Sequence, residues 1–318
     1  MELKVKILNW ETGFPVVVLD EVSANKIGVP PGGRASLKSL STSKEISAIV
    51  DIASNFIKEG EIGVSSEIKK ILNLKKGQKI IVSLSEPPDS LELIKKKLNK
   101  ARLSEKEIKE IVGDVVNNSL SGPELALFVS AVYKQGMTFK ETIYLIKAIL
   151  ETGSKLSLKN KFVVDKHSIG GIPGNRTTPI VVSICAAAGL VMPKSSSRAI
   201  TSAAGTADVI EAIAKVEFSN EELKKIIKKT NAFIIWGGSL GIVPADSKII
   251  QIEKILNIDP EAHLLASIIS KKLASGSNYI LIDIPYGKTA KVDKKTAIRL
   301  KRKFEKIGKY FHKKIKVV

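Results

Sequence analysis

Hydrophobic and polar positions change their spacing along the chain, and the first region has the pattern of short strands. Apolar runs at 16–19, 34–37, 46–50 and 79–84 are separated by turn residues, with a strong turn signal in Pro30-Pro31-Gly32-Gly33. One short helix is expected at 65–72, where serines precede an apolar periodic run. Residues 1–86 are therefore predicted to form a small β-barrel domain.

The next region has helical spacing. After Pro87-Pro88, apolar residues recur three and four positions apart, as at Leu91, Ile94 and Leu98. The pattern lasts to about residue 156 and returns over 244–275. We assign 87–156 and 244–275 to one all-helical domain.

The remaining segments alternate between strand-like and helical runs. Strands are expected at 161–165, 191–194, 231–236 and 278–284, with helices at 179–190 and through 208–213. This order is typical of a parallel sheet, in which ligands bind at the carboxyl ends of the strands. We assign 157–243 and 276–318, including a basic helix over 294–315, to an α/β phosphate-binding domain. It is expected to be incomplete, because such a sheet normally needs more strands. The chain is thus interpreted as a multidomain α/β protein.

Two polar segments follow strand-like runs in this α/β region. The first is Lys166-His167-Ser168-Ile169-Gly170-Gly171, and the second, 195–206, is rich in serine and contains Arg198. Glycine allows backbone N–H groups to approach an anion closely, and a helix that follows directs its positive end toward it. A lysine in one loop and an arginine in the other together favour the binding of two phosphate groups.

The amino-acid composition limits the classes of function that the protein can have. Three explanations of the net charge of +19 are open: the protein binds nucleic acid, it binds an anionic small molecule, or its source organism has lysine-rich proteins in general. Aromatic residues make up 5% of the chain and do not interleave with the lysine runs. This disfavours a surface on which the bases of single-stranded nucleic acid stack. The single cysteine, Cys185, excludes a disulfide framework and is interpreted as a buried apolar residue. No signal peptide or membrane-spanning run is evident, so we expect a soluble cytoplasmic protein.

The two loops give the chain a resemblance to a known family. The 166–171 segment, Ser196-Ser197-Arg198, the 205–208 segment Gly-Thr-Ala-Asp and the 270–274 segment Ser-Lys-Lys-Leu-Ala resemble the signature of the thymidine and pyrimidine nucleoside phosphorylase family. The N-terminal β-module is similar to that of its archaeal AMP phosphorylase branch, which implies a double-psi-like barrel. Family members continue past residue 318, so the resemblance also implies that the α/β domain is truncated at its C-terminal side.

The resemblance implies a pentosyltransferase activity. The expected reaction is phosphorolysis of a nucleoside 5′-monophosphate, AMP and possibly CMP or UMP, to free base and ribose 1,5-bisphosphate. Inorganic phosphate is the co-substrate, and no metal or other cofactor is expected. Pyrimidine-specific members place an arginine where Ile252 stands here, which disfavours a pyrimidine-only enzyme.

The resemblance also implies roles for individual residues. Asp259 is the expected catalytic proton donor to the leaving base. The residues expected to bind inorganic phosphate are Lys166, Ser168, Ser196 and Thr206. Those expected to bind the nucleotide are Gly171, Ser197, Arg198, Ala199, Ile200, Thr201, Ser202, Ser267 and Lys291. Lys288 is close enough in sequence to replace Lys291 in this role.

Three alternatives stay open at this point. One is a pyrimidine nucleoside phosphorylase, and another is an anthranilate phosphoribosyltransferase-like enzyme, which uses magnesium and a pyrophosphorylated ribose. The aspartate-rich metal motif of the latter is not evident. A non-enzyme alternative is an RNA-binding module, suggested by the charge and the β-barrel. The preferred interpretation expects nucleotide and phosphate as partners, no nucleic acid or membrane, and a homodimer or larger homo-oligomer.

Overall fold

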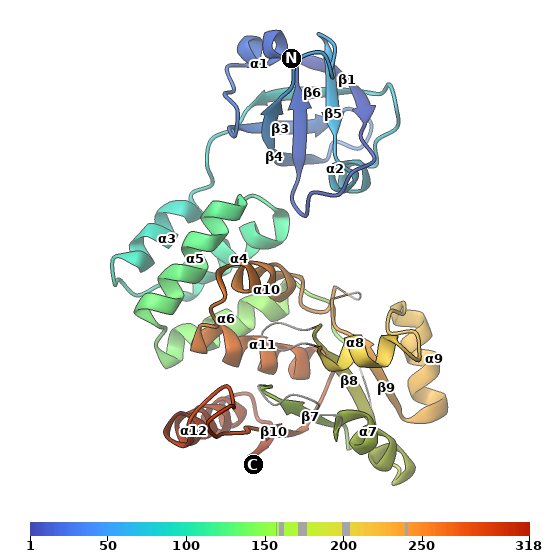
Figure 1. The fold of residues 1–318 in the computed structure, drawn as a ribbon, viewed down its shortest axis with the longest axis vertical. Helices are drawn as coiled ribbons and strands as arrows, with labels where there is room; N and C mark the ends of the chain where they lie inside the picture. The colour runs from blue at the N-terminus through green and yellow to red at the C-terminus, as the bar shows by residue number, and fades with distance from the viewer. Residues whose placement is uncertain (157, 159–161, 171–176, 199–203, 239–240) are drawn as a thin grey trace. The chain divides into compact units, whose positions relative to one another are not determined.

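The computed structural model describes residues 1–156, 158, 162–170, 177–198, 204–238 and 241–318 (Figure 1). The chain divides into two compact units. One contains Met1–Lys96 and Gly113–Phe128, and the other contains Lys97–Val112 and Val129–Val318. The three domain boundaries expected from the sequence stay a prediction. In the described part of the chain, no helix is both long enough and apolar enough to cross a bilayer.

The N-terminal strands close into a barrel in the order β1-β5-β2-β4-β3-β6 (Figure 1). Their bounds are Glu2–Ile7 (β1), Val16–Leu19 (β2), Arg34–Ser39 (β3), Glu45–Ile52 (β4), Glu61–Val64 (β5) and Lys79–Leu84 (β6). β1 pairs with β5, and β2 with β4, in parallel, and the remaining neighbours are antiparallel. Alternate apolar residues such as Leu3, Val17 and Leu37 fill the interior. The expected double-psi-like barrel is confirmed.

Helices cover the next part of the chain, as the spacing predicted. Two shorter helices accompany the barrel strands, α1 (Glu21–Ile27) and α2 (Ser66–Leu72). The longer ones are α3 (Ser90–Leu98), α4 (Glu105–Asn117), α5 (Gly122–Gln135), α6 (Phe139–Glu151), α10 (Pro244–Leu256) and α11 (Glu261–Ala274). α6 packs along α11 and also contacts α10, although these helices are far apart in sequence. The segment 244–275 thus joins the earlier helices.

The start of α6 contains a buried ion pair. Thr138 and Glu141 form a reciprocal capping box, and Glu141 also accepts hydrogen bonds from Lys97 Nζ at 2.8 Å and Leu103 N at 3.0 Å. Burial by itself would raise the pKa of Glu141, but the bonds from Lys97, Leu103 and Thr138 outweigh it and hold that pKa below its usual value.

The α/β part contains parallel strands, as expected. The strands are β7 (Val164–Ser168), β8 (Met192–Ser196), β9 (Ala232–Trp236), β10 (Tyr279–Asp283) and β11 (Lys314–Val317). Their order is β11-β10-β7 in one sheet and β8-β9 in the other, and a parallel bridge between Val163 and Val191 joins β7 to β8 near their amino ends. The helices are α7 (Thr177–Ala187), α8 (Thr206–Glu211), α9 (Asn220–Thr230) and α12 (Lys294–Tyr310).

Three local expectations were wrong. β7 and β8 extend through Ser168 and Ser196, so the first residues of both expected loops lie on strands. The basic helix ends at Tyr310, and 314–317 forms strand β11 beside β10, because the register places Ile315 and Val317 opposite apolar residues of that strand. Cys185 is half-buried, because α7 is exposed along much of its apolar surface, including Ile180 and Ile184.

The Glu141 contacts predict a stability difference between two glutamates of α6. Replacing Glu141 by alanine leaves the Lys97 charge buried and unpaired, and should lower the free energy of unfolding by about 3–5 kcal/mol. The matched control is Glu151→Ala, whose exposed pair with Lys109 should contribute about 0–1 kcal/mol. Urea unfolding of both variants measures the difference, and equal losses would contradict the analysis. Because the folded-state pKa of Glu141 is depressed, its contribution is present above about pH 4.3 and is lost as the pH falls through the folded-state pKa.

Candidate functional site

The first group of candidate ligands lies at the carboxyl ends of β7 and β10. Side chains alternate along a strand, so Lys166 and Ser168 share one face of β7, and Asp283 lies opposite Ser168 in the parallel register. Lys166 is buried, and its Nζ is 3.2 Å from Asp283 Oδ2, close enough for attraction but without hydrogen-bond alignment. Gly170 follows with φ near 85°, a left-handed conformation that glycine adopts at no steric cost.

A second charged pair lies on the other face of β7. Asp165 and Lys272 of α11 have completely buried side chains, and Lys272 Nζ is 2.8 Å from Asp165 Oδ2. His167 points to the same face as Asp165. Burial lowers the pKa of His167 well below its usual value, and the charges of Lys272, Lys194, Lys271 and Lys166 lower it further. His167 is therefore neutral at pH 7 and adds no charge.

Lys194 of β8 is a further buried lysine. It is 3% exposed, and its Nζ donates to the carbonyl oxygen of Ser195 at 2.6 Å. Burial lowers its pKa well below the usual value and the charge of Lys272 lowers it further, which Asp165 only partly offsets. In the described part of the chain no carboxylate forms an ion pair with it. An anion bound here would supply the missing countercharge.

The third group connects β8 to α11. Gly237 N donates to Ser196 O at 3.0 Å, and a Cβ built on Gly237 would lie 3.6 Å from Ser195 Cβ and 4.0 Å from Lys271 Cε. Lys271 Nζ donates to Ser267 Oγ at 2.7 Å and lies 2.5 Å from Asp246 Oδ2 of α10. Gly237 thus lies between Ser196, an expected phosphate ligand, and Lys271 with its partner Ser267.

Arg198 has a different environment from the other expected ligands. Its guanidinium group pairs with Asp208, Glu211 and Glu217, and lies 4.7 Å from the ring centroid of Trp236. The hydrogen bonds that Arg198 donates to Glu211, and then the one to Asp208, raise the Arg198 pKa despite partial desolvation. In the ligand-free protein this arginine is therefore bound to carboxylates, and a nucleotide phosphate would have to compete with them.

Asp259 and Lys291 are in direct contact. Lys291 Nζ donates to Asp259 Oδ2, and the two side chains are 20% and 18% exposed. Asp259 lies between α10 and α11, whereas Lys291 lies between β10 and α12. The expected proton donor and an expected nucleotide ligand therefore share one ion pair. Lys288, the alternative ligand, is exposed.

The remaining expected ligands divide into two sets. Thr206 is the first residue of α8, and Ser197 is half-buried directly after β8, with its carbonyl oxygen 3.3 Å from Ser196 Oγ. The residues that lie outside the described part of the chain are Gly171, Ala199, Ile200, Thr201 and Ser202. Among the described residues, no three His, Cys, Asp or Glu side chains form a group able to hold a metal ion.

Sequence reasoning missed the partners of the candidate ligands. Asp283 ends an apolar strand, and this position, like that of Ser168, could have marked it as a site residue. Asp246 stands in the first turn of a helix that begins with proline, where an acidic residue has an ordinary structural explanation. Asp165 and Lys194 are the last residues of the expected strands 161–165 and 191–194, and nothing in the sequence indicated that their charges would be buried.

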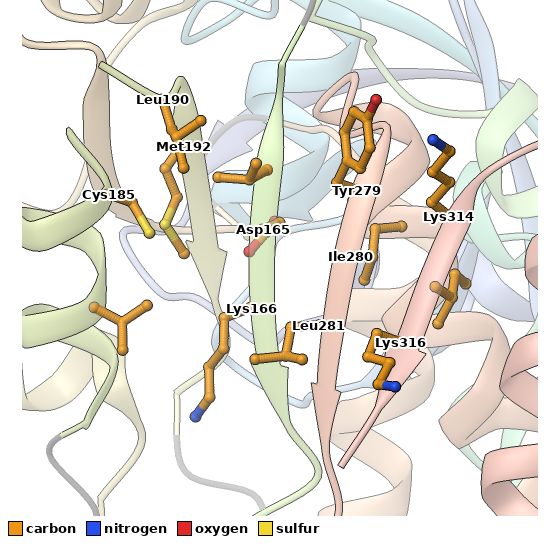
Figure 2. A pocket seen from close by; sticks show the side chains of 13 residues that line it. Asp165, Lys166, Cys185, Leu190, Met192, Tyr279, Ile280, Leu281, Lys314 and Lys316 are labelled. Carbon is orange, nitrogen blue, oxygen red and sulfur yellow. The ribbon is translucent and has the colours of Figure 1, made fainter. Parts of the chain in front are cut away.

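A separate cavity of about 360 Å³ lies beside β7, β10 and β11. Figure 2 shows Lys166 toward the carboxyl ends of the strands, and Tyr279 and Lys314 toward their other ends. Much of the lining is apolar, including Met192, Leu281 and the half-buried Cys185. Of the expected ligands that the structure describes, only Lys166 lines this cavity.

The environment of Lys194 predicts that replacing this lysine raises the stability of the protein but weakens its binding of anions. Lys194→Met should raise the free energy of unfolding of the ligand-free protein by about 1–2 kcal/mol, because an apolar side chain of similar size removes a buried, poorly compensated charge. Inorganic phosphate should stabilise the wild type but the variant much less. Thermal unfolding with and without phosphate measures both effects, and exposed Lys301→Met is the control.

The pH dependence of Lys194→Met follows from the depressed pKa of Lys194 in the folded state. The cost of the wild-type lysine is fully present below that folded-state pKa and disappears as the pH rises to the unfolded-state value of about 10.4. The stability gain of the variant should therefore shrink at high pH. An unchanged phosphate effect in Lys194→Met would show that this lysine does not contribute to an anion site.

Comparison with known proteins gives consistent matches. The helical bundle domain of a glycosyl transferase family matches residues 91–153, and the a/b domain of that family matches residues 160–295. AMP phosphorylase from Thermofilum pendens is 43% identical over 312 residues, which is 98% of this chain and 60% of that protein. AMP phosphorylases from Pyrococcus furiosus and Methanococcus vannielii are 43% and 38% identical, over 97% and 99% of this chain. The chain spans 61% and 62% of their lengths.

A solved structure supports the fold. Anthranilate phosphoribosyltransferase from Thermus thermophilus matches with a TM-score of 0.55 and 18% identity, over 68% of this chain and 63% of that one. At that identity the likeness extends to the architecture alone. The two matched domains, which together span more than half of the chain, show that it belongs to the glycosyl transferase family that combines a helical bundle domain with an a/b domain.

Proposed function

We propose that this protein catalyses the phosphorolysis of nucleoside 5′-monophosphates, with AMP as the first candidate substrate. The observation that supports this most directly is the similarity to proteins named AMP phosphorylase, which extends over nearly the whole chain. The cluster of buried lysines and serines at the carboxyl ends of β7 and β8 agrees with an anionic substrate. Because the chain spans about three fifths of these relatives, the activity is a proposal for this protein.

The proposed reaction brings two phosphate-bearing molecules together. An oxygen of inorganic phosphate attacks C1′ of the nucleotide, the bond from C1′ to the base nitrogen breaks, and ribose 1,5-bisphosphate forms. Lys166, Ser168 and Ser196 would hold the attacking phosphate, with Thr206 nearby in the sequence motif. Because these donors are fixed by strands before substrate arrives, their reorganisation cost is small, and such donors contribute about 3–4 kcal/mol each in other enzymes.

The leaving base needs a proton as the bond breaks. Asp259 would donate it, while Ser267 and Lys291 would bind the nucleotide with Ser197, Arg198 and the residues outside the described part. We propose that no metal or cofactor takes part, with inorganic phosphate as co-substrate. A cytoplasmic location and a homodimer or larger homo-oligomer belong to the same proposal. Ile252 is buried in α10, which agrees with the expectation that it does not act as a polar ligand for pyrimidines.

The first prediction is the reaction itself. The protein mixed with AMP and inorganic phosphate should release adenine and form ribose 1,5-bisphosphate in equal amounts, measured by chromatography. No product should form without phosphate. Activity that requires magnesium and a diphosphorylated sugar would instead indicate a phosphoribosyltransferase. Salt-dependent RNA binding without adenine release would indicate the non-enzyme alternative.

A second prediction concerns the proton donor. Asp259→Asn removes the acidic proton but preserves the shape of the side chain, so kcat with AMP should fall by roughly 10²–10⁴-fold. The stabilisation by inorganic phosphate should be unchanged, because Asp259 is not an expected ligand of that phosphate. Asp51→Asn, an exposed carboxylate in β4, is the matched control. Near-normal turnover in Asp259→Asn would exclude its assignment as the acid.

A further inference from the structure

The ion pair between Lys291 and Asp259 has a consequence for substrate choice that depends on the proposed function. In the ligand-free protein the ammonium group of Lys291 donates to the carboxylate of Asp259. A carboxylate held in this way accepts hydrogen bonds, whereas a proton donor must carry a proton and direct it toward the base. In this contact Asp259 is the acceptor and not the donor.

The two loops that carry this pair are anchored independently of it. On the Asp259 side, His263 Nδ1 lies 3.1 Å from Glu253 Oε1, which joins α10 to α11 on either side of the loop. Two residues after Asp259, Glu261 pairs with Arg299 of α12 at 2.8 Å.

The Lys291 loop is fixed in a similar way. Val292 forms a parallel bridge with Tyr286, and Asp293 caps α12 by accepting a hydrogen bond from Thr296 N at 2.7 Å. Since the backbone is held on both sides, the contact can break by rotation of the two side chains, without movement of a domain.

We infer that the 5′-phosphate of the substrate draws Lys291 away from Asp259, and that the carboxylate, no longer paired with a cation, takes up a proton from solvent and passes it to the nitrogen of the leaving base. A phosphate monoester carries about −1.5 to −2 charges near pH 7, against one on a carboxylate, and offers three acceptor oxygens. It therefore competes effectively for an ammonium group that is 20% exposed. A nucleoside has no 5′-phosphate, so Lys291 stays on Asp259 and the acid remains engaged.

This arrangement distinguishes Lys291 from the other cations of the site. Lys166 pairs with Asp283, and Arg198 pairs with Asp208, Glu211 and Glu217. None of those carboxylates is assigned a proton transfer, so releasing them changes only charge. Lys291 alone, among the described pairs of the candidate ligands, is bound to the proposed acid. It is therefore a specificity-determining residue, and it selects for the 5′-phosphate through the chemical step as well as through binding.

Lys291→Met tests the inference, because the variant loses the phosphate ligand and the partner of Asp259 together. With AMP, kcat/KM should fall by roughly 10–100-fold, the usual effect of losing a charged hydrogen bond. With adenosine, kcat should rise several-fold above the wild type, since the acid is no longer engaged. Lys294→Met, an exposed lysine in the first turn of α12, should behave as the wild type with both substrates.

A double variant tests whether the expected rise in kcat with adenosine depends on Asp259. Lys291→Met with Asp259→Asn should turn over adenosine no faster than Asp259→Asn alone. An adenosine kcat in Lys291→Met that is unchanged or lower, in a protein with wild-type circular dichroism, would overturn the inference and leave Lys291 as a simple phosphate ligand.

A crystal structure of the wild type with AMP gives a second test that does not depend on how the variants fold. Lys291 Nζ should contact the 5′-phosphate, and a Lys291 still bound to Asp259 would overturn the inference. A failure of this inference can be told apart from a failure of the proposed function. A wild type that releases no adenine from AMP contradicts both, whereas an active enzyme with the unexpected adenosine result contradicts only the release of Asp259.

Discussion

The central constraint on this site is that buried ammonium groups need carboxylates when no substrate is present. Removing a charge from water is costly unless an opposite charge lies close by. Among the candidate ligands and their neighbours, the pairs that meet this need are Lys166–Asp283, Lys271–Asp246, Lys272–Asp165 and Lys291–Asp259. They join β7 to β10, α11 to α10 and to β7, and the two loops that flank α11 and α12. The same contacts therefore organise the fold and hold the cations for a ligand.

Charge pairing also explains why the ligand-free protein tolerates so many lysines in one place. A phosphate group that binds Lys166 or Lys291 would replace a carboxylate on that lysine, so binding would exchange one ion pair for another. Lys194 is the exception in the described segments, because its contact is a backbone carbonyl. The strands beneath these groups would keep them in place during such an exchange, which is the pre-organisation that the proposed reaction between two anions requires.

The sequence predicted the architecture well where apolar spacing was unambiguous. β6 follows from its apolar run over 80–82, and α11 lies within the helical segment expected over 244–275. β1 was missed although apolar and charged residues alternate along it, and β11 was missed because its segment continues a basic helical pattern. Candidate ligands such as Lys166 and Ser168 could be predicted from their place after a strand-like run. Their partners could not, because Asp283 and Asp246 come from distant segments and only the three-dimensional fold brings them into contact.

The neighbouring lysines of α11 have a geometric consequence. Successive residues of a helix point about 100° apart, and here Lys271 contacts Asp246 of a neighbouring helix while Lys272 contacts Asp165 of a strand. These two contacts, on different sides of α11, fix the rotation of the helix about its own axis. An inserted or deleted residue upstream within this helix would swing both ammonium groups away from their partners simultaneously. Substitutions in this helix should therefore be tolerated better than insertions or deletions.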